Sequence, residues 1–342
     1  DAVLTHGFTM DEEGKKMSKS IGNVVEPQKI AEQNGIEILR LLIASAEYGD
    51  DLRLGKTIID QSSEAYRKLR NTLRYLLGAL NGFDESERLP KGADTPLLER
   101  WLLHRLWQLD AVVRRAYETF QFREAVSAIV EFCNVDLSAF YVDVRKDALY
   151  CDAPHSLRRR ACRSALDEVF SRLTAWLAPV LPFTMEEAWL TRFPDDVSVH
   201  LRLFPATPSS WEDEFAGEEM ARVREARAVV TGALEVARRD KLIGSALEAR
   251  PLVWEALRAA LLGVDFAELC ITSGVEVEAG QGPAEAFRLA ETPGVAVLIE
   301  AAPGVKCARS WKYFDPTTAD PRYPDITPRD AEAVAAWDAA HT

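Results

Sequence analysis

Apolar residues recur every three or four positions through much of the chain, which is the period of an amphipathic helix. The clearest case is the stretch 58–81, where the apolar stripe consists of leucines, Leu69, Leu73, Leu76 and Leu80. Arg67, Arg70 and Arg74 share the opposite face of this stretch. The pattern predicts one long helix with a buried apolar face and a basic face.

Capping and turn residues divide the other periodic segments into further helices. Pro27 suits the first turn of a helix, and the pair Asn34-Gly35 suits its end. Thr95-Pro96 predicts another helix start, and Thr184 followed by Glu186-Glu187 has the form of a capping box. The remaining helices are expected at about 36–46, 96–118, 122–150, 156–178 and 218–240. The expected fold class is mainly α, a helical bundle.

Short strand-like runs broken by Gly and Pro replace the helical pattern after residue 240. They lie at 252–254, 269–272, 275–278 and 295–301. This spacing favours a small α+β module. Thr327-Pro328 then predicts a terminal helix, with threonine as its cap and proline at its first position.

These changes of pattern predict five regions. The expected order is a short terminal segment, a helical bundle, a linker rich in Pro, Ser and acidic residues, a long helix with the α+β module, and a proline-rich tail. Their boundaries are 1–57, 58–193, 194–217, 218–302 and 303–342.

The composition is that of a soluble globular protein, with 47% apolar and 28% charged residues. The net charge of −13 argues against a protein coated for non-specific nucleic-acid binding, because such binding relies on Lys and Arg. The acidic excess is local, since residues 176–300 hold 21 acidic and 11 basic side chains. The rest of the chain remains able to present basic faces to RNA.

Apolar runs and cysteines indicate whether the chain enters a membrane or an oxidising compartment. The longest apolar runs fall short of the roughly 20 residues that span a bilayer, so no membrane segment or signal peptide is predicted. Five cysteines without a Cys-x-x-Cys pair indicate a reducing, cytoplasmic setting. The chain begins with Asp1 rather than Met, which indicates part of a longer protein.

The segment with the clearest candidate chemistry is Lys16-Met17-Ser18-Lys19-Ser20. Two ammonium groups and two hydroxyls on one loop suit the charge that builds on a triphosphate while its α-phosphorus is attacked. Flexible stems are needed because the pyrophosphate moves as it leaves. By composition alone, a Lys-x-x-Lys pattern is more often a solvated surface turn.

The neighbouring residues extend this motif into a much longer pattern. Thr5-His6-Gly7-Phe8 precedes it, and Ile21-Gly22-Asn23-Val24-Val25-Glu26-Pro27 follows it. The whole run resembles class I aminoacyl-tRNA synthetases for isoleucine, valine and leucine. Further segments are similar to the isoleucine branch, namely 38–41, 66–78, 81–84, 137–150 and 178–184.

This resemblance implies that residues 1–57 are the end of a Rossmann-type catalytic domain. It implies that Lys19 contacts ATP, supplied with Mg²⁺, that Lys16 supports it, and that Ser18 and Ser20 complete the ATP contacts. The bundle is then expected to bind the anticodon region of isoleucine tRNA, in a cytoplasmic monomer.

The family's His-x-Gly-His motif is absent from the sequence, so the chain alone is expected to be inactive. Two alternatives remain open, a free-standing RNA-binding module derived from a synthetase and a helical protein-interaction scaffold.

Arginines are the candidates for contacts with tRNA phosphates. They are Arg67, Arg70, Arg74, Arg158, Arg159 and Arg163. For the first three, the alternative is a solvated helix face with salt bridges. The last three open a helix, where positive charge is unfavourable, so RNA or an acidic neighbour is expected beside them. Tyr141 and Tyr150 are expected to pack in the core, with a polar link of Tyr141, Asp143 and Lys146 as an alternative.

The family's tail often carries a zinc knuckle of two Cys-x-x-Cys pairs. In this sequence the four positions fall on Cys307, Ser310, Thr327 and Asp330. One thiol, two hydroxyls and one carboxylate do not make a stable tetrahedral zinc site, which needs Cys or His. No zinc or other protein-bound metal is therefore predicted, and Thr327 and Asp330 are expected to cap the last helix instead.

Overall fold

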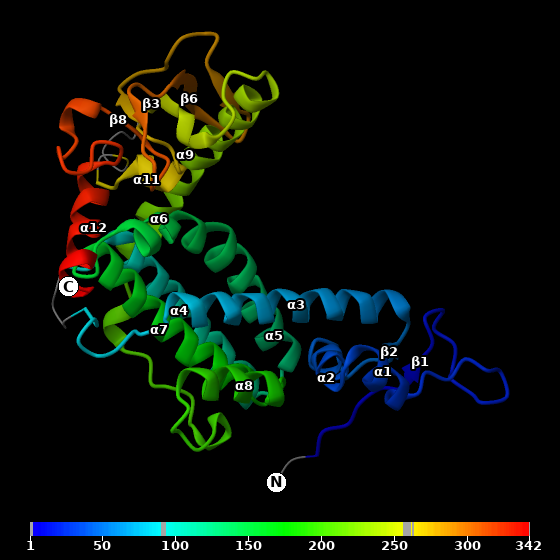
Figure 1. Ribbon diagram of the computed structural model, residues 1–342. Coiled ribbons are helices and arrows are strands. Elements are labelled where there is room, and N and C mark those ends of the chain that lie inside the picture. The colour runs from blue at the N-terminus through cyan, green and yellow to red at the C-terminus, as the bar shows by residue number, and fades with distance from the viewer. Residues whose placement is uncertain (1–2, 90–93, 256–260, 262, 342) are drawn as a thin grey trace. The chain divides into compact units, whose positions relative to one another are not determined.

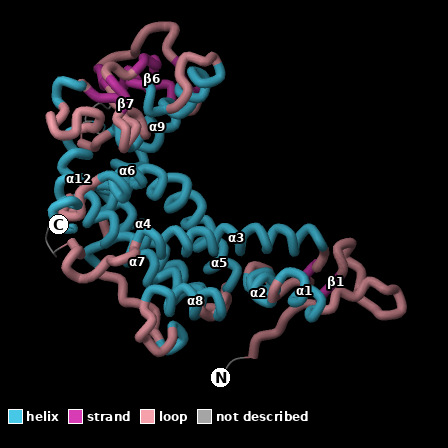
Figure 2. The backbone as a smooth tube through the Cα atoms, in the orientation of Figure 1, coloured by secondary structure: helices cyan, strands magenta, loops and turns pink. Residues whose placement is uncertain are grey.

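The computed structural model describes residues 3–89, 94–255, 261 and 263–341. The chain divides into two compact units (Figure 1). The first comprises residues 1–83, 105–140 and 165–212, and the second comprises residues 84–104, 141–164 and 213–342. Helices dominate the described residues, as Figure 2 shows, which agrees with the expected fold class.

The first unit begins with a small α/β segment. Its elements are β1 (Thr9–Met10), α1 (Pro27–Asn34), α2 (Ile36–Ala44) and β2 (Leu52–Arg53). The two strands pair in parallel. Pro27 lies in the first turn of α1, and Gly35, with φ of +95°, separates the two helices. Ile30, Leu42 and Leu54 form the buried core of this segment.

Long helices follow, and they confirm most of the predicted bundle. Their bounds are α3 (Lys56–Ala79), α4 (Leu97–Glu118), α5 (Phe122–Glu131), the π-helical η1 (Phe132–Val142), α6 (Asp143–Cys151), α7 (Leu157–Leu177) and α8 (Pro182–Arg192). The leucine stripe of α3 is buried, with exposed fractions of 0–4%. Burial of this stripe explains why the helical period was readable from the sequence.

The second unit contains the small α+β module. Its main elements are α9 (Glu214–Arg239), β3 (Ala249–Glu255), α11 (Phe266–Cys270), β4 (Glu276–Glu278), β5 (Phe287–Leu289), β6 (Thr292–Ala301), β7 (Val305–Lys306), β8 (Tyr313–Phe314) and α12 (Pro328–His341). The larger sheet has the order β4-β3-β6-β5. β3 runs parallel to β4 and antiparallel to β6, and α9 packs against β5 and β6.

Two element predictions are wrong in this unit. Residues 269–272 were expected as a strand, but 266–270 form α11, because Asp265 caps it by accepting a hydrogen bond from the Glu268 backbone N–H at 2.9 Å. The helix expected from 218 begins at Glu214, inside the predicted linker. Asp213 caps it by accepting from the backbone N–H of Ala216 at 3.0 Å.

The predicted capping box at Thr184 is also wrong. Pro182 occupies the first position of α8, so Thr184 lies inside the helix. Its hydroxyl instead contacts Glu37 and Tyr66, which come from α2 and α3. A box of Ser or Thr with a later Glu occurs inside helices as well as at their starts, and Pro182 was the stronger signal.

Among the described residues, one helical stretch, Phe122–Cys151, is long and apolar enough to cross a membrane by length and composition. More than half of its most apolar window, 56%, is buried inside the protein. Ile129 and Leu137 within it are fully buried. Much of this apolar stretch therefore belongs to the core of the protein.

All five cysteines are buried and free of disulfides. Burial raises the pKa of Cys133 and Cys162 to about 12, and that of Cys151 to about 11. Thiols with such pKa values stay protonated at neutral pH and are poor nucleophiles.

Candidate nucleotide loop and nucleic-acid interface

Asn23 organises the loop formed by residues 16–20. Its side-chain oxygen accepts from the Ser18 backbone N–H at 2.8 Å. Its amide nitrogen donates to Asp11 Oδ2 at 2.8 Å and to the Lys16 carbonyl at 3.2 Å. Hydrogen bonding, chiefly from Asn23, lowers the pKa of Asp11. Sequence reasoning did not assign a role to Asn23 or Asp11, although both lie within a few residues of the motif.

The two motif lysines project from this framework into solvent. Lys16 and Lys19 are exposed, and neither forms an ion pair within the described part of the chain. Lys15, by contrast, is paired with Glu13 at 2.5 Å. The hydroxyls of Ser18 and Ser20 lie 2.6 Å apart. The loop thus carries two ammonium groups without protein counter-ions and two hydroxyls, a set suited to an anionic ligand.

Met17 fixes the loop to the segment beneath it. Its partly buried side chain packs against the core of Ile30, Leu42 and Leu54. A methionine between two lysines therefore has a structural role, because it places an apolar anchor between two exposed cations. Burial of one such side chain contributes about 1.5–3 kcal/mol when complete, and proportionately less here.

The base of the loop is tied to its surroundings by backbone contacts. The Gly7 N–H donates to the Tyr48 carbonyl at 2.9 Å. A Cβ at Gly7 would lie 2.2 Å from the Asp50 carbonyl oxygen, so only glycine fits. The Glu12 carboxylate accepts from the Thr57 N–H at 3.3 Å, close to the start of α3, and its pKa is lowered by hydrogen bonds from Thr57. A carboxylate at a helix N-terminus is stabilising.

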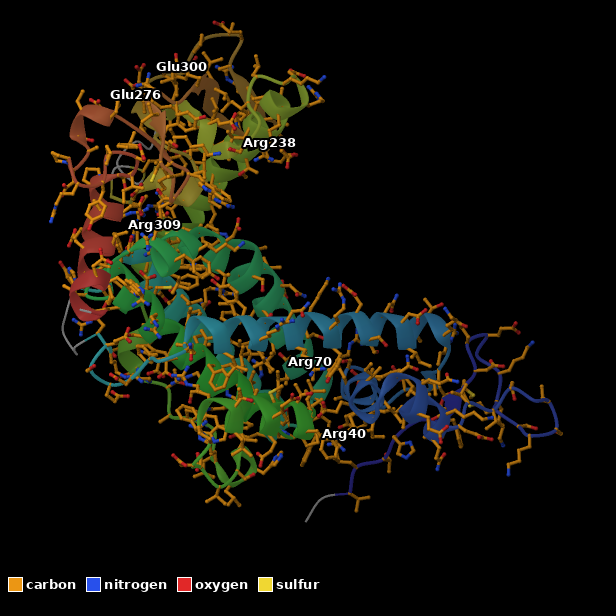
Figure 3. All side chains as sticks on the ribbon, viewed as in Figure 1. Arg40, Arg70, Arg238, Glu276, Glu300 and Arg309 are labelled. Carbon is orange, nitrogen blue, oxygen red and sulfur yellow. The ribbon has the colours of Figure 1, made fainter. Side chains whose placement is uncertain are left out.

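The arginines predicted on α3 form an exposed row along the helix, and Figure 3 labels one of them, Arg70. Arg67 pairs with Glu64 at 2.7 Å, and Arg70 pairs with Glu187 of α8 at 3.7 Å. Arg74 is exposed without an ion pair in the described residues. Exposed ion pairs of this kind are weak because solvent screens them, so these arginines remain available to a phosphate.

The second predicted basic cluster is engaged inside the second unit. Arg158 contacts Asp152 at 2.5 Å, and both Arg159 and Arg163 contact Glu87. The Arg163 side chain is only 4% exposed. Acidic neighbours were expected here because positive charge is unfavourable at a helix start, and these contacts provide them. The three arginines therefore have a structural role. Arg163 is too buried to face RNA.

A buried ion network lies next to that cluster, and sequence reasoning missed it. Arg145 contacts Glu99 at 2.6 Å and Glu268 at 2.8 Å, and all three side chains are at most 6% exposed. Tyr141 donates its hydroxyl to Glu99 at 2.8 Å. Tyr141 is thus in the core as expected, but its polar partner is Glu99. The suggested link of Asp143 and Lys146 is instead a separate, exposed pair.

The four positions that correspond to the zinc knuckle converge on one carboxylate. Asp330 Oδ2 accepts from Ser310 Oγ at 2.6 Å, Thr327 Oγ at 2.8 Å and Cys307 Sγ at 3.1 Å. The Thr327 hydroxyl also accepts from the Asp330 N–H at 3.1 Å, which confirms Thr327 as the cap of α12. This donor set, one thiol and two hydroxyls around one carboxylate, does not fit a tetrahedral zinc ion.

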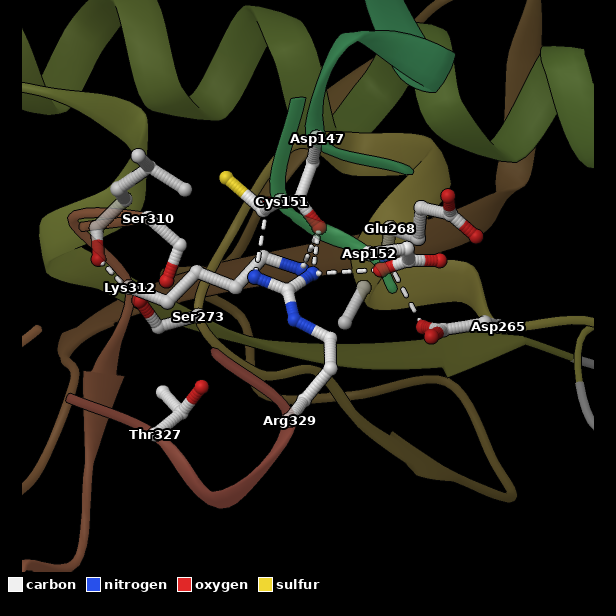
Figure 4. A network of polar contacts seen from close by, with 12 residues as sticks. Asp147, Cys151, Asp152, Asp265, Glu268, Ser273, Ser310, Lys312, Thr327 and Arg329 are labelled. Carbon is white, nitrogen blue, oxygen red and sulfur yellow. Dashed lines mark hydrogen bonds and ion pairs between the residues drawn. The ribbon is translucent and has the colours of Figure 1, made fainter. Parts of the chain in front are cut away.

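Charged side chains surround this Asp330 cluster, and Figure 4 shows part of them. Arg329 contacts Asp147 and lies 3.4 Å from Asp152, while Lys312 contacts Asp147 at 3.1 Å. Burial raises the pKa of Asp147, but hydrogen bonds and charge from Arg329 and Lys312 outweigh it and lower the pKa overall. The tail is therefore joined to α6 by ion pairs.

Two exposed aromatic side chains border a surface pocket of about 350 Å³ in the second unit. Tyr150 is 64% exposed and Trp311 is 61% exposed. Lys306 lies 5.5 Å from the centre of the Trp311 ring, and Lys146 and Arg309 line the same pocket. Tyr150 was expected in the core, which is wrong. It lies on the outer face of α6, and its exposure was not readable from helical spacing.

Comparisons with known proteins place these features in a family. Residues 1–55 match the model for "tRNA synthetases class I (I, L, M and V)", and residues 99–253 match the model for "Anticodon-binding domain of tRNA ligase". The chain belongs to the class I tRNA synthetases. The resemblance seen in the loop motif is thereby confirmed.

Relatives of this synthetase chain are isoleucine–tRNA ligases. That of Brucella abortus is 54% identical over 98% of this chain and 34% of its own length. That of Caulobacter vibrioides is 54% identical over 99% of this chain and 35% of its own length. The chain thus spans about a third of the relatives' length and is homologous to their carboxy-terminal part.

One solved structure with lower similarity is a LeuRS of Agrobacterium radiobacter K84 in a ternary complex with tRNA and LeuAMS. It has 16% identity and a TM-score of 0.49, over 73% of this chain and 25% of that chain.

Proposed function

We propose that this chain supplies the ATP loop and the anticodon-region tRNA contacts of an isoleucine–tRNA ligase, in the cytoplasm and as a monomer. The complete enzyme would join isoleucine to ATP, release pyrophosphate and transfer the aminoacyl group to isoleucine tRNA. Because the chain spans about a third of its relatives' length, the residues that bind isoleucine are expected in the remaining two thirds.

The observation that carries the ATP role is the loop itself. Lys16 and Lys19 are exposed and have no counter-ion among the residues that the structure describes. Their loop has its backbone held by Asn23 and its middle anchored by Met17. Pre-positioned cations stabilise the charge that develops on phosphate oxygens in a transition state. The hydroxyls of Ser18 and Ser20 add hydrogen-bond donors, and Mg²⁺ is expected to arrive with ATP.

Two surfaces support tRNA binding. The row of Arg67, Arg70 and Arg74 on α3 suits a phosphate backbone, since its ion pairs are exposed and weak. The pocket bordered by Tyr150 and Trp311 combines aromatic faces with cationic side chains, which suits unpaired bases. Arg158, Arg159 and Arg163 are not part of the proposed tRNA surface, because their guanidinium groups contact Asp152 and Glu87. We also propose that the tail functions without zinc.

Isoleucine-dependent exchange of pyrophosphate into ATP tests the ATP role, in the complete synthetase that carries this chain. Lys19→Ala should lower the rate by about 100-fold or more, as loss of a group that contacts the transition state does. Lys15→Ala, which removes a neighbouring lysine already paired with Glu13, is the matched control and should stay within about twofold of the parent.

Equal effects of the two lysine substitutions would contradict the assigned role of Lys19. For tRNA, binding should favour isoleucine tRNA over other tRNAs and weaken as salt rises. A chain that binds all tRNAs alike would instead be a general RNA-binding module.

A further inference from the structure

Helix α2 carries two charged side chains that meet the junction between α7 and α8. Glu37 and Arg40 are three positions apart, so they project from the same side of the helix. Glu37 is 7% exposed although it is an acid. A buried carboxylate needs several hydrogen bonds to offset its desolvation, and the structure supplies them.

Glu37 caps α8 from outside that helix. Its carboxylate accepts from the backbone N–H groups of Phe183 at 2.8 Å and Thr184 at 3.1 Å, in the first turn of α8. The Thr184 hydroxyl donates to it as well, and the Tyr66 hydroxyl of α3 lies 3.4 Å from it and 2.8 Å from Thr184 Oγ. A negative group at a helix N-terminus is stabilised by the free N–H groups and the helix dipole.

Arg40 binds the other side of the same junction. Its Nε donates to the Val180 carbonyl at 2.9 Å and its Nη2 donates to the Pro179 carbonyl at 2.7 Å. These carbonyls follow the C-terminal end of α7, where positive charge is favourable. One turn of α2 therefore places an acid on the start of α8 and a base just beyond the end of α7.

The same helix reaches the nucleotide loop on another face. Leu42 of α2 is 2% exposed and belongs to the core against which Met17 packs. Helix α2 thus links the two regions, because Leu42 belongs to the core against which Met17 packs, and Glu37 and Arg40 on the same helix contact the α7–α8 junction. The loop and the junction lie in the regions that match the synthetase model and the anticodon-binding model, respectively.

We propose that Glu37 and Arg40 are positioning residues, which set the 16–20 loop relative to the helical bundle by fixing α2 to the α7–α8 junction. The readout by ATP use rests on the proposed function. Neither residue touches ATP or tRNA in this proposal. They act by holding the anchor of Met17 in place, so that Lys16 and Lys19 meet the triphosphate in the correct position.

The test uses Glu37→Ala, Glu37→Gln and Arg40→Met in the complete synthetase. The KM for ATP in isoleucine-dependent pyrophosphate exchange should rise by about 10- to 100-fold in Glu37→Ala and Arg40→Met, because misplacing a catalytic group by about 1 Å has effects of this size. Glu37→Gln keeps one acceptor oxygen and should lie between parent and Ala. The dissociation constant for tRNA should stay within about twofold, since the bundle remains folded. Glu32→Gln, an exposed acid on α1, is the matched control.

Hydrogen exchange of the amides at 15–24 gives a readout that does not need activity. It should accelerate by about tenfold or more in Glu37→Ala and Arg40→Met, because α2 no longer holds the loop. Unchanged ATP KM and unchanged exchange would overturn the proposal. So would a parallel loss of tRNA affinity, ATP use and melting temperature, which would mark a purely structural role. A parent enzyme without isoleucine-dependent exchange would overturn the proposed function instead, and the amide readout would still decide the positioning role.

Discussion

Replacing Asp330 by asparagine is the most informative perturbation of the tail. The Asp330 side chain is 0% exposed, and its Oδ2 accepts three hydrogen bonds, from Ser310, Thr327 and Cys307. Its Oδ1 also contacts Arg309 at 3.0 Å. The substitution keeps the size of the side chain but removes the charge. It also places the new amide N–H₂ group, which is a donor, against the donors on Oδ2 or against Arg309.

The magnitude follows from these contacts. A hydrogen bond to a charged group contributes about 1.5–3 kcal/mol, and removing one partner of a buried ionic cluster costs about 3–5 kcal/mol. Asparagine can still accept one hydrogen bond, so we expect Asp330→Asn to destabilise the tail by about 3 kcal/mol. That free energy corresponds to roughly a 100-fold change in an opening equilibrium.

Native-state hydrogen exchange measures this opening locally, which a whole-chain melting curve does not. Protection of the amides in 307–311 and 329–339 should fall by about 100-fold in Asp330→Asn. Asp325→Asn makes the same chemical change at an exposed position of the same segment and should leave protection within about twofold of the parent. A decrease below about threefold in Asp330→Asn, or equal decreases in both variants, would refute the reasoning.

The cluster also predicts a pH dependence. Burial raises the pKa of Asp330, but the hydrogen bonds from Ser310, Cys307 and Thr327 and the charge of Arg329 outweigh it, so the pKa is lowered. The stabilisation is therefore fully present above the unfolded pKa of about 3.9, and it is lost as the pH falls through the lower, folded value. The parent tail should loosen on acidification below about pH 4, and this contribution should be absent in Asp330→Asn.

Three further predictions concern the rest of the chain. Asn23→Ala removes the hydrogen bonds that shape the 16–20 loop, so pyrophosphate exchange should slow by about tenfold or more without a change in tRNA affinity. An unchanged rate would show that the loop is ordered by other contacts. Arg145→Met leaves the buried Glu99 without its cationic partner and should destabilise the second unit by about 3–5 kcal/mol, measured by urea unfolding. A neutral result would mean that water reaches the site. Trp311→Ala should weaken tRNA binding by about 1–3 kcal/mol in a filter-binding titration, as loss of a stacking ring does. The melting temperature should stay constant because the ring is exposed, and unchanged affinity would exclude base stacking there.

The spacing of apolar residues predicted most of the helices correctly. The leucine stripe of α3 repeats every three or four residues because one face of the helix is buried, and that face is visible in the sequence alone. Short elements contain too few residues for the apolar pattern to repeat. The five residues of α11 were predicted as a strand, since a short apolar run carries no resolvable period.

The sequence by itself determined the helices, the family and the motif with its two lysines, because these depend on local spacing or on uninterrupted runs of residues. Only the tertiary structure decided what the polar residues do. Glu37 contacts Thr184 across 147 positions, and Arg309 contacts Asp330 across 21. Such pairs produce no periodic pattern in the sequence. A charged side chain can be buried only where folding brings polar partners next to it, and these partners are distant along the chain. For the same reason, the pairing of Arg163 with Glu87 could not be predicted from the sequence.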